Sequence, residues 1–170
     1  MLQESGFADL SIEAIAADAN VGKATIYRWW PTKATLVAEA FSNSADQELR
    51  FPNTGSVRAD VSQQMHRVAR LFRSKRGRIV AALLGGGQSD PELLEAFRER
   101  FMLPRRREAY ETLRRGIRRA EIPQDTDLDL VLDALYGPIY MRFLIRHDTL
   151  TDEFVTNLCD LVLSALTPSR

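Results

Sequence analysis

The chain has 170 residues, of which 45% are hydrophobic and 27% charged, the composition of a globular protein large enough to bury a core. Lysine plus arginine equals aspartate plus glutamate, so no overall positive field favours nucleic acid. No apolar run reaches the roughly 18 residues of a membrane span, and the start lacks a signal-peptide pattern. The single cysteine, Cys159, excludes an internal disulfide framework and favours a cytoplasmic protein that does not enter membranes.

Residues 11–30 predict two short helices joined by a tight turn. Ser11 stands at the N-cap position of the first helix, and Glu13 places a negative charge in its first turn, where the helix dipole favours one. Four apolar residues at helical spacing form its inner stripe: Ile12, Ile15, Ala16 and Ala19. Asn20 tolerates the left-handed backbone that the turn needs.

The second helix is expected over about residues 23–30, with Ile26 and Trp30 turned inward beside Val21. Its outer residues are cations, a hydroxyl, a phenol and an indole: Lys23, Thr25, Tyr27, Arg28 and Trp29. Such a surface, without a carboxylate, suits a DNA groove, because phosphates attract cations and base edges accept hydrogen bonds. The spacing alone fits an ordinary helical hairpin equally well.

The segment VGKATIYRWWPTKATLV, residues 21–37, resembles the signature of the tetracycline-repressor (TetR) family of bacterial transcription regulators. The residues before it resemble the family's first part: Gly6, Phe7, Leu10, Ser11, Ile12, Ile15 and Ala16. The resemblance implies base or phosphate contacts from Lys23, Thr25 and Trp29. It also implies phosphate contacts from Ser11, Tyr27 and Lys33.

This chain departs from the family pattern in two places. Asn20 stands where the family usually has Gly, and only five residues precede Gly6, where the family has a full first helix. Two functions therefore stay open. One is a DNA-binding regulator; the alternative is a dimeric small-molecule-binding or scaffolding protein that lacks DNA binding because its first helix is absent.

A third helix, capped by Thr32, is expected from about residue 33 to residue 47. Its predicted inner face is made of Leu36, Val37, Ala40 and Phe41. Residues 51–55 contain Pro and Gly and predict a loop, which marks a boundary between a helix-turn-helix head, residues 1–50, and a body, residues 55–170.

The body is predicted to be helical throughout. Apolar residues at helical spacing predict a helix over residues 57–73: Val57, Val61, Met65, Val68 and Phe72. A shorter helix is expected to stop at the glycines of residues 85–87. Asp90 and Pro91 open a helix to about residue 119, in which Pro104 predicts a kink. Two further helices are expected over about residues 125–146 and from residue 151 onward.

The last two helices carry more apolar surface than one subunit needs, which favours a second copy as partner. The segment LYGPIYMRFLI, residues 135–145, also resembles the C-terminal half of many TetR-family regulators. That resemblance implies a homodimer in which two helices from each subunit form a four-helix bundle. The residues expected at this interface are Leu132, Ile139, Phe143, Phe154, Leu158, Leu161 and Val162.

No catalytic, cofactor or metal constellation stands out, so an enzyme is not expected. A small-molecule pocket in the body is expected to be lined by Met65, His66, Phe72, Phe101, Tyr110, Tyr136 and Tyr140. Ordinary core packing is the alternative for each of these residues.

Together these features predict an all-α, homodimeric repressor. Its two recognition helices would enter successive major grooves of a palindromic double-stranded operator, roughly 34–36 Å apart. A small-molecule effector in the body would weaken DNA binding by linkage.

Overall fold

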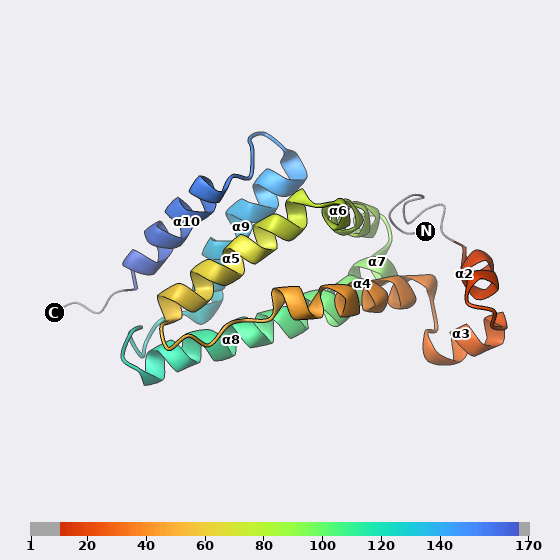
Figure 1. Ribbon diagram of the computed structural model, residues 1–170, viewed down its shortest axis with the longest axis horizontal. Coiled ribbons are helices and arrows are strands. Elements are labelled where there is room, and N and C mark those ends of the chain that lie inside the picture. Colours follow the sequence, from red (N-terminus) through yellow and green to blue (C-terminus); the bar gives the residue numbers. More distant parts are fainter. Residues whose placement is uncertain (1–10, 167–170) are drawn as a thin grey trace. The chain divides into compact units, whose positions relative to one another are not determined.

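The structure, a computed structural model, describes residues 11–166, and all its regular elements in that range are helical, as predicted (Figure 1). Gly6, Phe7 and Leu10, together with the expectation about the first helix, lie outside the described residues. Within that range the chain forms two compact units, residues 11–46 with 74–104 and residues 47–73 with 105–166. The head and body predicted at residues 1–50 and 55–170 are a different division, which stays a prediction.

The first unit contains two short helices, a longer one and a helical layer built from the middle of the chain. Its elements are α2 (Ile12–Asp18), α3 (Lys23–Trp29), most of α4 (Lys33–Leu49), α6 (Lys75–Gly87), α7 (Pro91–Phe97) and one turn of π-helix, η1 (Arg98–Met102). The Thr32 hydroxyl accepts a hydrogen bond from the Thr35 amide at 3.2 Å and caps α4, as predicted. Val37 and Phe41 are buried in α4, whereas Ala40 is exposed, so its predicted inward position is wrong.

The helix predicted to stop at the glycines of residues 85–87 does end there, at Gly87, although all three glycines still belong to α6. Gly86 and Gly87 pack closely against α7. A Cβ atom on Gly86 would lie 3.0 Å from Leu93 Cδ2, and one on Gly87 would lie 3.1 Å from Leu94 Cβ. The absence of these atoms lets the two helices approach, which offsets the roughly 0.5–1 kcal/mol that glycine costs inside a helix.

The helix predicted from Asp90 to about residue 119 is interrupted. Its start is confirmed, because the Asp90 carboxylate accepts hydrogen bonds from the Glu92 and Leu93 amides. In place of a simple kink at Pro104, η1 separates α7 from α8 (Leu103–Arg118). Proline has no amide hydrogen for the carbonyl four residues earlier, and a π turn rearranges the backbone hydrogen bonds just before it.

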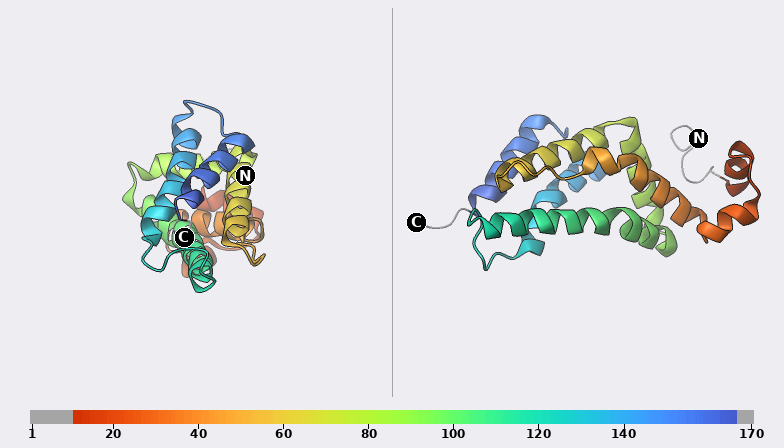
Figure 2. Two further views of the ribbon diagram at one scale, coloured as in Figure 1. Left: turned by 90° about the vertical axis from the view of Figure 1, so that its left-hand side faces the viewer. Right: turned by 60° about the horizontal axis from the view of Figure 1, so that its bottom comes forward.

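The second unit is built on α5 (Val57–Arg73), which has the predicted bounds and buries all five predicted core residues. Helices α9 (Leu128–Ile145) and α10 (Asp152–Ser164) pack beside it, and the three lie side by side in both ribbon figures (Figures 1 and 2). Asp127 caps α9 and Thr151 caps α10 through side-chain hydrogen bonds to backbone amides. Most of α8 completes this unit.

Buried polar side chains of α5 fix the loop between α4 and α5. The fully buried Asp60 carboxylate accepts hydrogen bonds from the Thr54 amide and hydroxyl, both at 2.8 Å. One turn later, the buried Gln64 amide donates to the Leu49 carbonyl at 2.6 Å. The Gln64 bond satisfies a carbonyl at the end of α4 that has no partner within the helix, and the Asp60 bonds hold the loop at Thr54.

Within the part of the chain that the structure describes, no helix combines the length and the apolar character needed to cross a membrane.

Candidate functional site

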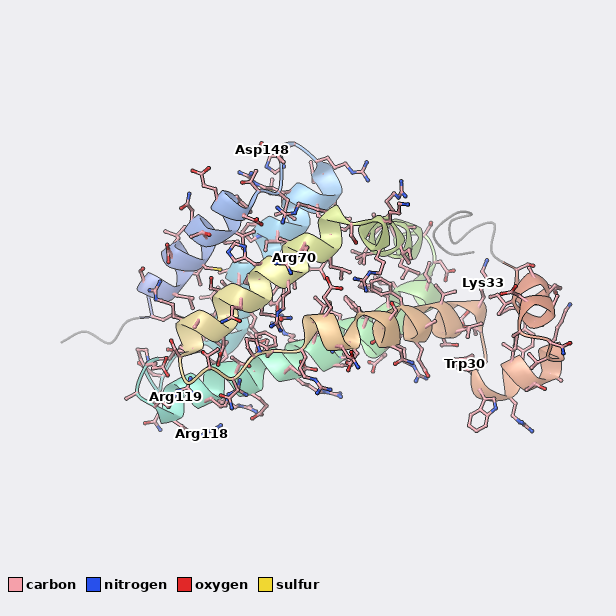
Figure 3. The ribbon with its side chains drawn as sticks, in the orientation of Figure 1. Trp30, Lys33, Arg70, Arg118, Arg119 and Asp148 are labelled. Carbon is pink, nitrogen blue, oxygen red and sulfur yellow. The ribbon has the colours of Figure 1, made fainter. Side chains whose placement is uncertain are left out.

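The two short helices of the first unit share a small apolar core. Ile12 and Ala16 of α2 are buried against Ile26 of α3, which is only 5% exposed. Partly buried apolar residues surround them: Ile15, Trp30 and Leu36. The predicted inward positions of Ile26 and Trp30 are therefore confirmed, with Trp30 half-buried at the corner between α3 and α4 (Figure 3).

The turn between α2 and α3 has the predicted geometry. The Ser11 hydroxyl accepts a hydrogen bond from the Ala14 amide at 3.1 Å, which caps α2. Asn20 adopts the left-handed conformation at a φ of 53°. Val21 follows it outside both helices, and its side chain is exposed, so its predicted inward position is wrong. The backbone amide of Val21, and not its side chain, stabilises the turn, because it donates a hydrogen bond to the Ala16 carbonyl at 2.9 Å.

The outer side of α3 presents the predicted cations and aromatic rings to solvent. Trp29 is 67% exposed and Tyr27 is 47% exposed, values that a packed core does not explain. Lys23, Thr25 and Arg28 are exposed on the same short helix, and the Arg28 guanidinium lies 5.8 Å from the centre of the Trp29 ring. Two further predicted residues, Ser11 and Lys33, are half-buried at the starts of α2 and α4 (Figure 3 labels Lys33).

An ion pair that the sequence did not predict crosses between the two helices. The Lys23 ammonium donates a short hydrogen bond to the Glu13 carboxylate, and both side chains are exposed. This hydrogen bond holds the pKa of the Glu13 carboxyl below its usual range. The two residues lie ten positions apart on different helices, so no helical spacing connects them in the sequence.

Helix α3 carries two cations and no carboxylate of its own, although Glu13 of α2 pairs with one of them and the chain as a whole is neutral. No acidic residue occurs between Asp18 and Glu39, and the Glu39 carboxylate is paired with Arg100 at 2.9 Å. A rigid helix that presents cations, a hydroxyl and flat aromatic rings can contact phosphates and the edges of bases in a DNA groove.

The structure brings together only some of the seven residues expected to line a pocket. Phe72 stacks on Phe143, with ring centres 4.2 Å apart, and meets Tyr140 edge-on at 5.1 Å. Burial raises the pKa of Tyr140 from 10.0 to about 12 and also raises the pKa of Tyr136. Both phenols are therefore neutral hydroxyl groups at physiological pH, next to an aromatic cluster. Met65 is buried on the same helix as Phe72.

The other three expected pocket residues lie in different surroundings. His66 is 3.2 Å from the Thr156 hydroxyl and 3.6 Å from the Asp152 carboxylate. Tyr110 lies beneath the guanidinium groups of Arg106 and Arg114. Phe101 belongs to the first unit, where it packs on Phe41 and Phe97. The sequence places each of these residues on a helix but does not show which way its side chain points.

Several residues expected at a dimer interface are used within the subunit. Leu132, Ile139 and Leu158 are buried in its own core, so they have almost no surface to offer a partner. The half-buried Phe143 and Phe154 are covered by Phe72 and by the Arg142 guanidinium, which lies 3.7 Å from the Phe154 ring centre. Val162 is half-buried, and Leu161 is 73% exposed.

A different set of apolar residues is exposed on α9. These are Leu130, Met141, Leu144 and Ile145, with the exposed Gly137 between them. They alternate with the buried stripe of Leu132, Leu135 and Ile139, so they occupy the outward side of the same helix. The sequence could have revealed this second stripe, because its residues also recur at helical spacing, on the side opposite the buried residues.

No cluster of histidine, cysteine, aspartate or glutamate able to hold a metal ion occurs within residues 11–166. Cys159 is buried, as predicted, and burial raises the pKa of its thiol to about 11, so it stays protonated.

Two family models match the chain. The model described as "Bacterial regulatory proteins, tetR family" matches residues 1–40, and "Tetracyclin repressor-like, C-terminal domain" matches residues 51–162. The HTH-type transcriptional regulator YdeS of Bacillus subtilis is 38% identical over 165 residues, which cover 97% of this chain and 82% of YdeS.

Solved structures share the fold. The TetR family transcription regulator SCO0332 superposes with a TM-score of 0.88 at 35% identity, covering 98% of this chain and 92% of that one. The transcriptional regulator FadR from Bacillus subtilis, solved in complex with stearoyl-CoA, has a TM-score of 0.71 at 19% identity, covering 96% and 92%.

Proposed function

Because this chain belongs to the TetR family of bacterial helix-turn-helix transcription regulators, we propose that it binds a palindromic operator as a homodimer and is released by a small molecule. Members of this family are DNA-binding regulators and not enzymes. The observation that carries the proposal is the exposed Tyr27 and Trp29, held outward by the buried Ile26 on a helix of only seven residues. We assign DNA binding to residues 1–50 and effector binding and dimerisation to residues 55–170.

Each outward residue of the head has a proposed role. Thr25 and Trp29 read base edges, and Tyr27, Arg28 and Lys33 contact phosphates, as does the backbone near the Ser11 cap. Lys23 contacts a base or a phosphate. Phosphate contacts set affinity for any sequence, whereas base contacts select the operator.

The outward stripe of α9 supports a homodimer. Leu130, Met141 and Ile145, together with Leu161 of α10, form an apolar face that a second copy would cover by two-fold symmetry. Gly137 lies within this stripe, and nothing lies within 4 Å of where its Cβ would be, so a partner helix could come close there. We therefore place these residues at the interface, together with the half-buried Val162, and leave Phe143 and Phe154 to the subunit's own packing.

The effector is proposed to be largely apolar, with a hydrogen-bond acceptor. The cluster of Phe72, Tyr140 and Phe143 supplies aromatic surface, and the neutral Tyr136 and Tyr140 hydroxyls can donate. FadR, a structural neighbour of this fold, was solved with stearoyl-CoA. By linkage, an effector that binds better to the DNA-free form lowers the affinity for DNA by the same factor as DNA lowers the affinity for the effector.

Binding of variants to DNA flanking the protein's own gene tests the head. Tyr27→Phe or Lys33→Ala should weaken binding to operator and unrelated DNA alike. Thr25→Ala or Trp29→Ala should weaken operator binding by about 1–3 kcal/mol and relax the choice of sequence. Met102→Ala, at an exposed position in η1, is the control and should leave both affinities unchanged.

Retention of full affinity by all four variants in a gel-shift titration would remove the DNA-binding assignment. A dimer that binds no DNA at all would instead support the alternative of a small-molecule-binding or scaffolding protein.

A further inference from the structure

The Glu13–Lys23 ion pair places an acidic group beside a residue proposed to contact DNA. Glu13 lies in the first turn of α2, and Lys23 is the first residue of α3. The ammonium and the carboxylate are in direct hydrogen-bond contact, while both side chains keep about half of their surface in solvent. A carboxylate offers an ammonium the same kind of contact as a phosphate oxygen does.

A carboxylate that already occupies an ammonium weakens the contact that the same ammonium can make with a phosphate, because the two anions repel each other and share one positive charge. A DNA phosphate that approaches Lys23 must displace Glu13 or share the lysine with it, and Glu13 itself repels the phosphate. The other cation of α3 differs in this respect, because the Arg28 guanidinium lies near the uncharged Trp29 ring.

We propose that Glu13 is a positioning residue that competes with DNA for Lys23. In the free protein it holds the ammonium over the α2–α3 turn, and on DNA the lysine transfers to a phosphate. Because a phosphate contact carries no sequence information, Glu13 lowers affinity for operator and unrelated DNA by the same factor. This inference rests on the proposed DNA-binding function.

The test is a double-mutant cycle with the full chain, measured by fluorescence anisotropy on an operator duplex and on an unrelated duplex. Glu13→Gln keeps the size of the side chain and removes its charge. It should tighten binding to both duplexes by about twofold to fivefold, the range expected of an exposed ion pair. The ratio of the two affinities should not change. The slope of log affinity against log salt should become steeper by at most about one.

Two variants separate competition from general repulsion. In a Lys23→Met background, Glu13→Gln should have no more than a small remaining effect, because the group for which it competes is gone. Asp18→Asn removes the same charge from another exposed position of α2, and it should change affinity less than Glu13→Gln does. An equal gain from Asp18→Asn, or an equal gain with and without Lys23, would overturn the proposal in favour of general repulsion.

A measurement without DNA tests the pair itself. The pKa of the Glu13 carboxyl, followed by NMR, should lie below its usual range and return toward it in Lys23→Met. An unchanged value in Lys23→Met would overturn the proposal. If the wild-type protein binds DNA tightly and Glu13→Gln gives no gain, only the proposed role of Glu13 is overturned. If the wild-type protein binds no DNA, the proposed DNA-binding function is overturned as well.

Discussion

The outer sides of α3 and α9 are both rich in exposed apolar side chains, yet they differ in what accompanies those side chains. On α3, Trp29 and Tyr27 stand among cations and a hydroxyl. On α9, Leu130, Met141 and Ile145 form an aliphatic stripe with a bare glycine in it. Exposed apolar area alone therefore does not identify a partner. Aromatic rings beside cations suit DNA, with its phosphates and base edges, whereas aliphatic side chains suit another apolar protein surface.

The largest expected effect is on the aliphatic stripe. Met141→Asp combined with Leu161→Asp should weaken a dimer by more than about a hundredfold, because both carboxylates would be buried without partners. Sedimentation velocity should then show a monomer that keeps its helical circular dichroism. Met102→Asp, which places a carboxylate at an exposed apolar residue of η1, is the control and should remain dimeric. If the double variant sediments as a dimer, like the wild-type protein, the interface lies elsewhere.

The inner and outer sides of α3 should differ almost as sharply. Ile26→Ala should lower the free energy of unfolding of the head by about 2–4 kcal/mol, since it leaves a cavity in a small core. Trp29→Ala should change it by less than about 0.5 kcal/mol, because that ring is mostly in solvent. Hydrogen exchange of the α2 and α3 amides can report the loss locally. Equal destabilisation by the two variants would contradict the division of α3 into a packed and a contacting side.

A smaller effect is expected at the start of α2. Ser11→Ala removes the hydroxyl that accepts from the Ala14 amide, and it should cost about 1 kcal/mol of helix stability. Ser11→Asp keeps an acceptor at the cap and should restore the stability. If chemical denaturation gives the same midpoint for all three proteins, the cap does not contribute.

The smallest effect at neutral pH, and a distinct one at alkaline pH, concerns Tyr140. Burial raises its pKa from 10.0 to about 12, so its neutral form stabilises the fold at and below pH 10. That contribution is lost as the pH rises through about 12. Tyrosinate absorbance should therefore show a late step that Tyr140→Phe removes. An unaltered alkaline titration curve in Tyr140→Phe would show that this phenol is not shielded from water.

Local rules in the sequence predicted the elements well. The bounds of α5 follow from apolar spacing, and the caps at Ser11, Thr32 and Asp90 follow from side chains that accept hydrogen bonds from the first turn. Asn20 was identified from its tolerance of a left-handed backbone. These features depend on residues within four positions of one another, and such residues are visible in a one-dimensional pattern.

Features that depend on a second element were predicted less well. The glycines signal a stop locally, and α6 does end at Gly87, but the sequence did not show their close packing against Leu93 and Leu94 of α7. Periodicity predicts an interface role for Ile139, because it shows a stripe without showing which element covers it, and the structure buries this residue in the subunit's own core. The Glu13–Lys23 pair likewise needed the two helices to be placed before its atoms could meet.

The π turn between α7 and α8 has a consequence for insertions and deletions. Leu93, Phe97 and Phe101 are all buried, although steps of four residues drift by about 40° each around a regular α-helix. The looser winding of residues 98–102 compensates for this drift, as one inserted residue would. Deleting one residue there would leave a segment well able to form α-helix, yet every later side chain would be turned by about 100°. We therefore expect insertions and deletions at residues 98–102 to be rarer among relatives than substitutions of these residues.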